Sequence, residues 1–262
     1  MTKSPPFSRK PEAVEYGSPD HPFEGFLFRT PEPPDPEHRV VLFHEYMGME
    51  QHLLDKAQSL AGHGFTVVVA DLYGKGIRPE THDQAHGHYR NLKTNRIELR
   101  RRALMAVEQA RQYPWEGRTQ LVSVLGFSMG GCAALEVARS GIDLNLAISV
   151  YGYLDSPEPD PNRAIMADLL VFHGLRDAIV PIKDLISFVS SASAMPCRCE
   201  IITYSNAGHG FCNPSVIPDP VLGNRYDPIM HQRTWNHILA RLAEVTKDLS
   251  RAQKPKPQRI RR

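Results

Sequence analysis

Gly126-Phe127-Ser128-Met129-Gly130-Gly131 decides the fold that this sequence predicts, because it joins a strand to a helix within a single turn. The apolar run Gln120–Leu125 precedes it, and a helix is expected over Met129–Arg139. The glycines remove β-carbons that would collide in such a turn. The context therefore favours a strained turn that holds Ser128 above the carboxyl edge of a sheet, over a small-residue turn with an incidental serine.

Strands and helices alternate along the rest of the chain. The expected strands are Val14–Tyr16, Phe23–Phe28, Arg39–Phe43, Thr66–Asp71, Gln120–Leu125, Leu146–Tyr151, Asp168–His173 and Cys199–Tyr204. Apolar residues recur at helical spacing over 49–61, 97–110, 129–139, 182–191 and 228–249. This order predicts an α/β fold with an eight-stranded, mostly parallel sheet and helices on both faces, the first two strands being antiparallel.

We expect one domain over residues 1–250, because no segment has the composition of a linker. The connection Gly152–Ala167 is too short for a helical cap domain, so the pocket should be open and suit small substrates. Residues 251–262 carry six positive charges and no acid. They predict a disordered basic tail, with a weak contact to an anionic surface as the alternative.

Composition excludes several classes of function. Of the 262 residues, 41% are hydrophobic and 23% charged, and the longest apolar runs are too short to span a bilayer. No apolar stretch near the N-terminus indicates a signal peptide. Without the six charges of the tail, 25 of the 31 basic residues remain against 29 acidic ones, so a nucleic-acid partner is not expected. Nothing in the sequence indicates an oligomeric state.

The four cysteines lie at positions 132, 197, 199 and 212 and form no C-x-x-C pair. They predict neither a disulfide framework nor a zinc site, and they suit a reducing cytoplasm. His82, His86 and His88 crowd one segment without a carboxylate or cysteine at metal-ligand spacing. We therefore expect a solvated loop or helix start there, and no metal.

Two further residues follow strands in the way that Ser128 does. Asp177 comes just after strand Asp168–His173, and His209 comes after strand Cys199–Tyr204 within Ala207-Gly208-His209-Gly210-Phe211. A serine hydroxyl becomes a good nucleophile only when a base takes its proton, and an acid orients that base. The sequence thus nominates Ser128 as nucleophile, His209 as base and Asp177 as orienting acid, in the order Ser, Asp, His.

The oxyanion of the intermediate would need backbone donors. The N–H of Met129 at the start of its helix is one candidate. The second is expected from the loop after Phe43, at Tyr46.

These motifs resemble the dienelactone hydrolase (carboxymethylenebutenolidase) family of the α/β-hydrolase superfamily from about Arg39 to the last helix. The matching pieces are Phe43-His44-Glu45, Ala70-Asp71-Leu72-Tyr73-Gly74, the Ser128 turn, His173-Gly174 leading to Asp177, and His209-Gly210-Phe211-Cys212-Asn213-Pro214. The resemblance implies an α/β-hydrolase sheet, no metal or organic cofactor, and hydrolysis of a small ester or lactone through an acyl-enzyme.

The chain departs from the family pattern at two points. Dienelactone hydrolases use cysteine where this chain has Ser128, which puts dienelactone in doubt as the substrate. In the family, the glutamate matching Glu45 approaches the nucleophile; here Glu45 either keeps that task or braces the oxyanion loop. No motif decides whether Arg78 or Arg90 matches the arginine with which relatives grip a substrate carboxylate.

Tyr151 and Phe211 complete the pocket candidates, although packing beneath the loop is an equal alternative for Tyr151. Two other functions stay open on the same residues. One is hydrolysis of a thioester or peptide acyl bond, since one apparatus serves acyl transfer generally. The other is a non-catalytic protein that binds a ligand on a hydrolase scaffold.

Overall fold

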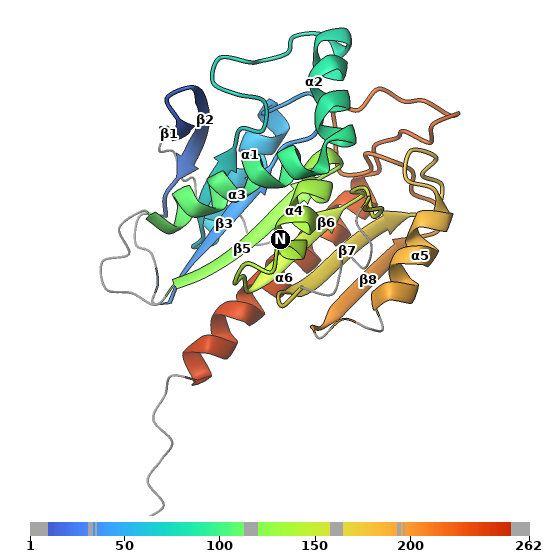
Figure 1. Ribbon diagram of the computed structural model, residues 1–262. Coiled ribbons are helices and arrows are strands. Elements are labelled where there is room, and N and C mark those ends of the chain that lie inside the picture. Colours follow the sequence, from blue (N-terminus) through green and yellow to red (C-terminus); the bar gives the residue numbers. More distant parts are fainter. Residues whose placement is uncertain are drawn as a thin grey trace, which may run out of the picture.

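An eight-stranded sheet forms the centre of the computed structural model, which describes residues 10–30, 34, 36–112, 120–157, 165–192, 195 and 197–252 (Figure 1). The strands are β1 (Glu12–Ser18), β2 (His21–Phe28), β3 (Glu37–Phe43), β4 (Thr66–Ala70), β5 (Gln120–Phe127), β6 (Leu146–Val150), β7 (Asp168–Gly174) and β8 (Cys199–Tyr204). Their order in space is β1-β2-β4-β3-β5-β6-β7-β8. Strand β2 is antiparallel to β1 and β4, and the other pairs are parallel, which confirms the predicted sheet.

Six helices are described in the same part of the chain. They are α1 (Gln51–Gly62), α2 (His82–Thr94), α3 (Arg96–Gln112), α4 (Met129–Arg139), α5 (Ile182–Ala192) and α6 (Pro228–Ala252). For the segment that contains His82, His86 and His88 we predicted a loop or a helix start, and this segment is the beginning of α2. The predicted basic tail lies outside the described residues except for its first two, which end α6.

The helices cover both faces of the sheet. On one face, α1 and α6 contribute Leu53, Leu60 and Leu242 to a buried apolar cluster. On the other face, α3, α4 and α5 form a second cluster (Figure 1). Helices on both faces were predicted, because parallel strands that are connected by right-handed crossovers require them.

Alternate residues of the central strands belong to the two apolar clusters. In β3, Val40 and Leu42 belong to the cluster under α1 and α6, whereas Val41 and Phe43 belong to the cluster under α3 and α4. All four are fully buried. Because successive strand residues point to opposite faces, a strand buried on both sides has no polar alternation, and each such side chain contributes roughly 1.5–3 kcal/mol by burial.

The connection after β6 runs along the carboxyl edge of the sheet, and its described parts are residues 151–157 and 165–167. The predicted absence of a cap domain concerns this connection, of which residues 158–164 lie outside the described chain. Tyr153 and Leu154, in its first part, are buried.

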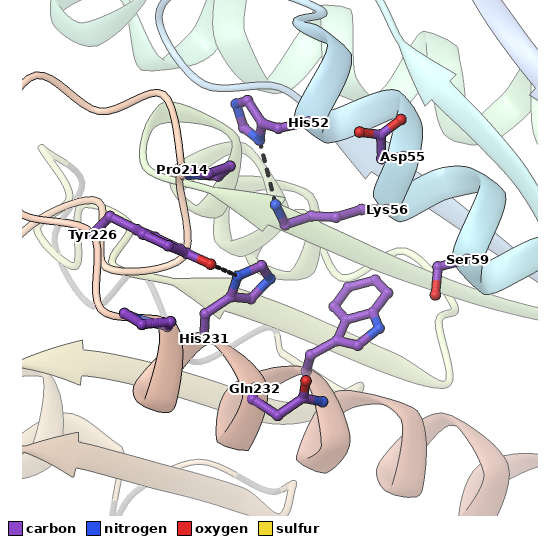
Figure 2. A pocket seen from close by; sticks show the side chains of 10 residues that line it. His52, Asp55, Lys56, Ser59, Pro214, Tyr226, His231 and Gln232 are labelled. Carbon is purple, nitrogen blue, oxygen red and sulfur yellow. Dashed lines mark hydrogen bonds between the residues drawn. The ribbon is translucent and has the colours of Figure 1, made fainter. Parts of the chain in front are cut away.

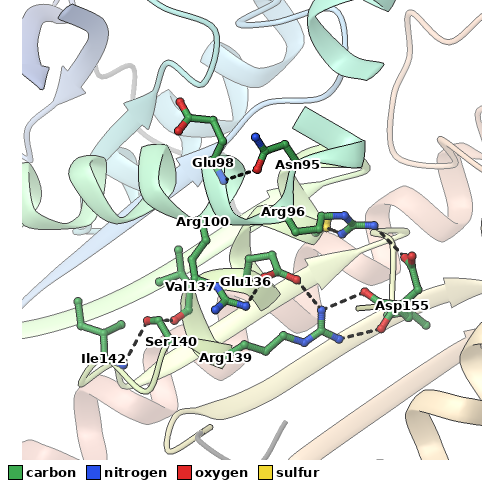
Figure 3. Close-up of polar contacts among 12 residues, drawn as sticks. Asn95, Arg96, Glu98, Arg100, Glu136, Val137, Arg139, Ser140, Ile142 and Asp155 are labelled. Carbon is green, nitrogen blue, oxygen red and sulfur yellow. Dashed lines mark hydrogen bonds and ion pairs between the residues drawn. The ribbon is translucent and has the colours of Figure 1, made fainter. Parts of the chain in front are cut away.

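A buried polar network ties this connection to α3 and α4 (Figure 3). The carboxylate of Glu136, on α4, accepts from Arg100 Nη2 at 2.6 Å and from Arg139 Nη1 at 2.9 Å. Arg139 also donates to the Leu154 carbonyl at 2.7 Å, and Arg96 donates to Asp155 Oδ1 at 2.9 Å. The network therefore links the helix that follows the Ser128 turn to the segment beside it.

No helix in the described ranges combines the length and apolar character that crossing a bilayer requires.

Replacing Glu136 by leucine should lower the free energy of unfolding by about 3 kcal/mol, because the Arg139 side chain is 1% exposed and would lose its carboxylate partner. Urea denaturation followed by circular dichroism measures the change. As the control, Glu98→Gln removes a partly exposed carboxylate that pairs with Arg101 and Arg102 on α3, and should cost about 1 kcal/mol or less. Equal losses in the two variants would contradict the assigned role of the network.

Candidate active site

Ser128 occupies a strained turn between β5 and α4. Its φ of 52° and ψ of −116° lie outside the regions that non-glycine residues ordinarily adopt. The Ser128 N–H donates to the Val150 carbonyl at 3.0 Å, which holds the turn against β6. A β-carbon on Gly126 would lie 1.9 Å from the Gly130 carbonyl oxygen, so the turn can close only with glycine there.

His209 and Asp177 meet Ser128 at the carboxyl edge of the sheet. The Ser128 Oγ lies 2.9 Å from His209 Nε2, and His209 Nδ1 lies 2.8 Å from Asp177 Oδ2. Because an ionised carboxylate only accepts, Nδ1 carries the proton and Nε2 is left to accept from the serine hydroxyl. All three side chains are buried, with residue exposures of 4% for Ser128 and Asp177 and 6% for His209.

The Asp177 carboxylate is held by backbone donors. Its Oδ1 accepts from the N–H groups of Ile179 at 2.9 Å and Val180 at 2.8 Å. These two bonds leave Oδ2 directed at His209. A carboxylate that is held in this way can orient an imidazole.

The loops that carry Asp177 and His209 pack backbone against backbone. A β-carbon on Gly174 would lie 2.5 Å from the Ala207 carbonyl oxygen, and one on Gly208 would lie 1.6 Å from that of Gly223. Glycine at these positions lets the ends of β7 and β8 approach closely enough for the hydrogen bond between His209 and Asp177.

The oxyanion candidates come together at the start of α4. A β-carbon on Gly130 would lie 2.3 Å from the Phe43 carbonyl oxygen, so the first turn of α4 packs directly against the end of β3. Met129 is the first residue of α4, where N–H groups have no acceptor within the helix. Tyr46 lies in the loop after β3, and its carbonyl accepts from Tyr73 Oη at 2.5 Å.

Tyr73 is a residue whose role the sequence did not indicate. Its hydroxyl also lies 3.9 Å from Met129 Sδ, so one side chain contacts both oxyanion candidates. Burial raises the pKa of Tyr73 well above its usual value, which keeps the hydroxyl a neutral donor. The motif Ala70-Asp71-Leu72-Tyr73-Gly74 could have indicated this role, since it begins at the end of β4, at the same edge of the sheet.

Glu45 is buried beside the site, and both of its carboxylate oxygens have partners. Oε1 accepts from Tyr151 Oη at 3.0 Å, and Oε2 accepts from Asn213 Nδ2 at 3.2 Å. Within the described residues no hydrogen bond joins Glu45 to Ser128. Of the two roles considered from the sequence, these contacts favour bracing of the loop that carries Tyr46.

The cleft beside Ser128 has a volume of about 470 Å³. Tyr46, Tyr89 and Tyr153 line it together with aliphatic side chains such as Ile179 and Val216. Its acidic lining residues are Glu45, Glu50, Asp83 and Asp219, and its histidines are His82, His86 and His209. No lysine or arginine of the described chain lines this cleft.

Helix α2 supplies part of the cleft wall. His82, His86 and Tyr89 lie three to four residues apart and share one face of the helix. The Tyr46 hydroxyl bonds to His82 Nδ1, and the Tyr89 hydroxyl bonds to that of Tyr153. The spacing of these three residues in the sequence could have indicated that one face of this helix lines the cleft. Among the described residues, no group of three or more histidine, cysteine, aspartate or glutamate side chains has the arrangement of a metal site.

The four remaining pocket candidates do not line the cleft. Tyr151 and Phe211 are fully buried behind it, with the Tyr151 ring centroid 5.2 Å from that of His209. Arg78 lies 3.6 Å from both Asp71 and Glu24, and Arg90 is exposed on α2. Tyr151 thus packs against the histidine and Phe211 packs against Tyr151, while neither arginine lines the cleft beside Ser128.

The sheet order, the turn at Ser128 and the histidine and aspartate at the same edge define an α/β-hydrolase. A model of the dienelactone hydrolase family matches residues 23–246, and the chain belongs to this family, as its motifs predicted. Members of the family are carboxylic ester hydrolases, so the protein is a hydrolase of esters or lactones.

Individual relatives agree with this membership. A Yersinia pestis protein, provisionally named a carboxymethylenebutenolidase, is 23% identical over 184 residues, covering 66% of this chain and 67% of that protein. The solved structure named m3DLH is 26% identical, with a TM-score of 0.81, and the match covers 90% of this chain and 98% of that one. A dienelactone hydrolase-like promiscuous phosphotriesterase from metagenomic libraries shares the fold, with 24% identity, a TM-score of 0.83 and the same coverage.

The backbone strain at Ser128 has a measurable consequence. Glycine normally destabilises a protein relative to alanine, but at a φ of 52° and a ψ of −116° the order should reverse. Ser128→Gly should be more stable than Ser128→Ala by about 1 kcal/mol, as measured by urea denaturation. At Ser140, which has a helical φ of −70°, the same pair of variants should show the usual order. If alanine were the more stable at both positions, the turn would not be strained.

Proposed function

We propose that this protein hydrolyses small, uncharged esters or lactones through an acyl-enzyme on Ser128, with His209 as general base and Asp177 as the acid that orients it. The observation that carries the proposal is the chain of two hydrogen bonds, 2.9 Å from Ser128 Oγ to His209 Nε2 and 2.8 Å from His209 Nδ1 to Asp177 Oδ2. This geometry meets the requirement that the base be within reach of the proton that it takes.

Acylation begins when Ser128 Oγ attacks the substrate carbonyl carbon and its proton passes to His209 Nε2. The negative charge that develops on the carbonyl oxygen would be stabilised by the N–H groups of Met129 and Tyr46. Asp177 stabilises the imidazolium form of His209. As the intermediate collapses, the carbon–oxygen bond to the leaving group breaks, and His209 returns the proton to the departing alkoxide.

Deacylation repeats these steps with water. His209 Nε2 takes a proton from a water molecule, whose oxygen attacks the acyl carbon. As the new tetrahedral intermediate collapses, the bond between the acyl carbon and Ser128 Oγ breaks, His209 returns its proton to Ser128 Oγ, and the acid product is released. In a lactone the leaving alkoxide stays attached to the acyl group, so one hydroxy acid is released.

The lining of the cleft supports uncharged substrates. A substrate carboxylate would meet the four acidic lining residues and, among the described residues, no lysine or arginine. Like charges that are brought together in a partly buried site repel each other, and the repulsion is strongest where solvent is excluded. The volume of about 470 Å³ fits a small ester. The unpaired cysteines support a reducing compartment such as the cytoplasm.

Ser128→Ala should abolish covalent labelling by a fluorophosphonate probe and lower turnover of p-nitrophenyl acetate by at least about 10³-fold, because the nucleophile is lost. Intact-protein mass spectrometry and absorbance measure the two effects. Cys132→Ala is the matched control: this thiol lies one turn along α4 but is buried, and burial raises its pKa to about 12. The control should label normally. A wild-type protein that does not label, or a Ser128→Ala protein that does, would contradict the proposal.

Charge should separate substrates of similar size. For p-nitrophenyl butyrate and the singly charged mono-p-nitrophenyl succinate, kcat/KM should favour the neutral ester by roughly tenfold, because of the acidic lining. Asp83→Asn, in the first turn of α2, should narrow the difference, whereas Asp184→Asn, in the first turn of α5, should leave it unchanged. Faster hydrolysis of the anionic ester would mean that a cation reaches the substrate.

A further inference from the structure

A second cavity lies between α1 and α6 (Figure 2). It has a volume of about 420 Å³, and none of the residues that line it lines the cleft beside Ser128. Much of its wall consists of rings, namely those of Tyr226, Trp235, Pro214 and Pro228. The other lining residues are polar, namely His52, Asp55, Lys56, Ser59, His231 and Gln232. Rings combined with a few placed polar groups are typical of a site for a small organic molecule that itself carries a polar group.

Lys56 brings a buried ammonium group to this cavity. The residue is 6% exposed, and its Nζ donates to the Cys212 carbonyl at 3.2 Å and to His52 Nδ1 at 3.3 Å (Figure 2). It also lies 5.2 Å from the centroid of the Phe127 ring. No carboxylate in the described part of the chain is within ion-pair distance of Nζ. Burial lowers the pKa of Lys56, because an ammonium without a counter-ion is costly there, and an anion from solution would stabilise the charged form.

Two histidines, His52 and His231, also line the cavity. His52 Nδ1 accepts from Lys56, so its Nε2 carries the proton and donates to Glu50 at 3.3 Å. Burial lowers the pKa of His231 to about 4, and the positive charge of Lys56 acts in the same direction. His231 Nδ1 lies 3.1 Å from the Tyr226 hydroxyl, which donates to it and leaves the proton on Nε2 (Figure 2).

We propose that this cavity binds a small aromatic carboxylate, with the carboxylate beside Lys56 Nζ and the ring against Tyr226 and Trp235. One ammonium matches one negative charge. A doubly charged anion would bind less well, because the carboxylates of Glu45, Asp55 and Glu50 lie close to Lys56 and lower the net positive charge of the site. The aromatic and proline side chains favour a ring over an aliphatic chain.

Isothermal titration calorimetry of the full-length protein with benzoate tests the proposal. Benzamide has the same shape without the charge and should bind at least about tenfold more weakly, and inorganic phosphate should also bind more weakly than benzoate. Lys56→Met should lower the affinity for benzoate at least about tenfold, since the charge-assisted hydrogen bond is lost. Lys183→Met, the same change at an exposed lysine on α5, should leave the affinity unchanged.

A second variant covers the case in which Lys56→Met does not fold. Ser59→Phe fills the cavity from α1 while leaving Lys56 in place, and should remove benzoate binding. The proposal would be overturned if benzamide bound as well as benzoate or if phosphate bound more tightly than benzoate. It would also be overturned if benzoate did not bind, or if both variants that alter the cavity kept the wild-type affinity for it.

Discussion

The structure around Ser128 depends on the close backbone contact between the end of β3, the end of β5 and the first turn of α4. Gly126 and Gly130 make this contact possible, because any β-carbon there would overlap a carbonyl oxygen. The contact holds Ser128 in a backbone conformation that is unfavourable for serine in an unfolded chain. Strain of this kind persists only where the surrounding structure determines it, and here that structure is two strands and a buried helix.

The parallel sheet then brings the partners of Ser128 to the same place. Parallel strands end at one edge, so the loops after β3, β5, β7 and β8 all meet there. The position of His209 is determined on every side: Asp177 bonds one ring nitrogen, the Ser128 hydroxyl bonds the other, and the Tyr151 ring packs against it. Tyr151 is in turn bonded to Glu45, which connects the histidine to the loop that carries Tyr46.

Charge distinguishes the two cavities. The cleft beside Ser128 has acidic side chains and no lysine or arginine among its described lining residues, whereas the cavity between α1 and α6 contains the buried ammonium of Lys56. The cavities lie on either side of one segment, since Lys56 bonds to the Cys212 carbonyl and the next residue, Asn213, bonds to Glu45. The two proposed ligands, a neutral ester and an aromatic carboxylate, would therefore lie close together without sharing a lining residue.

The sequence by itself determined the order of the eight strands, five of the six described helices, the turn at Ser128 and the identity of the residues that follow β7 and β8. The segment of α2 was expected only as a loop or a helix start. These features depend on local periodicity and on chain order, which a linear pattern records. The sequence also indicated the family, because the motifs of the family are short and contiguous. Local sequence patterns do not show in which direction a side chain points at the end of a strand.

Only the tertiary structure decided which side chains face the cleft. Tyr151 and Phe211 turn behind His209, Arg78 pairs with acids elsewhere, and α2 brings His82 and Tyr89 to the wall. The burial of the Lys56 ammonium could not be predicted either, since α1 has an ordinary amphipathic pattern. Each of these outcomes depends on contacts between elements that are distant in the chain, and their packing is settled only when the whole sheet and its helices are assembled.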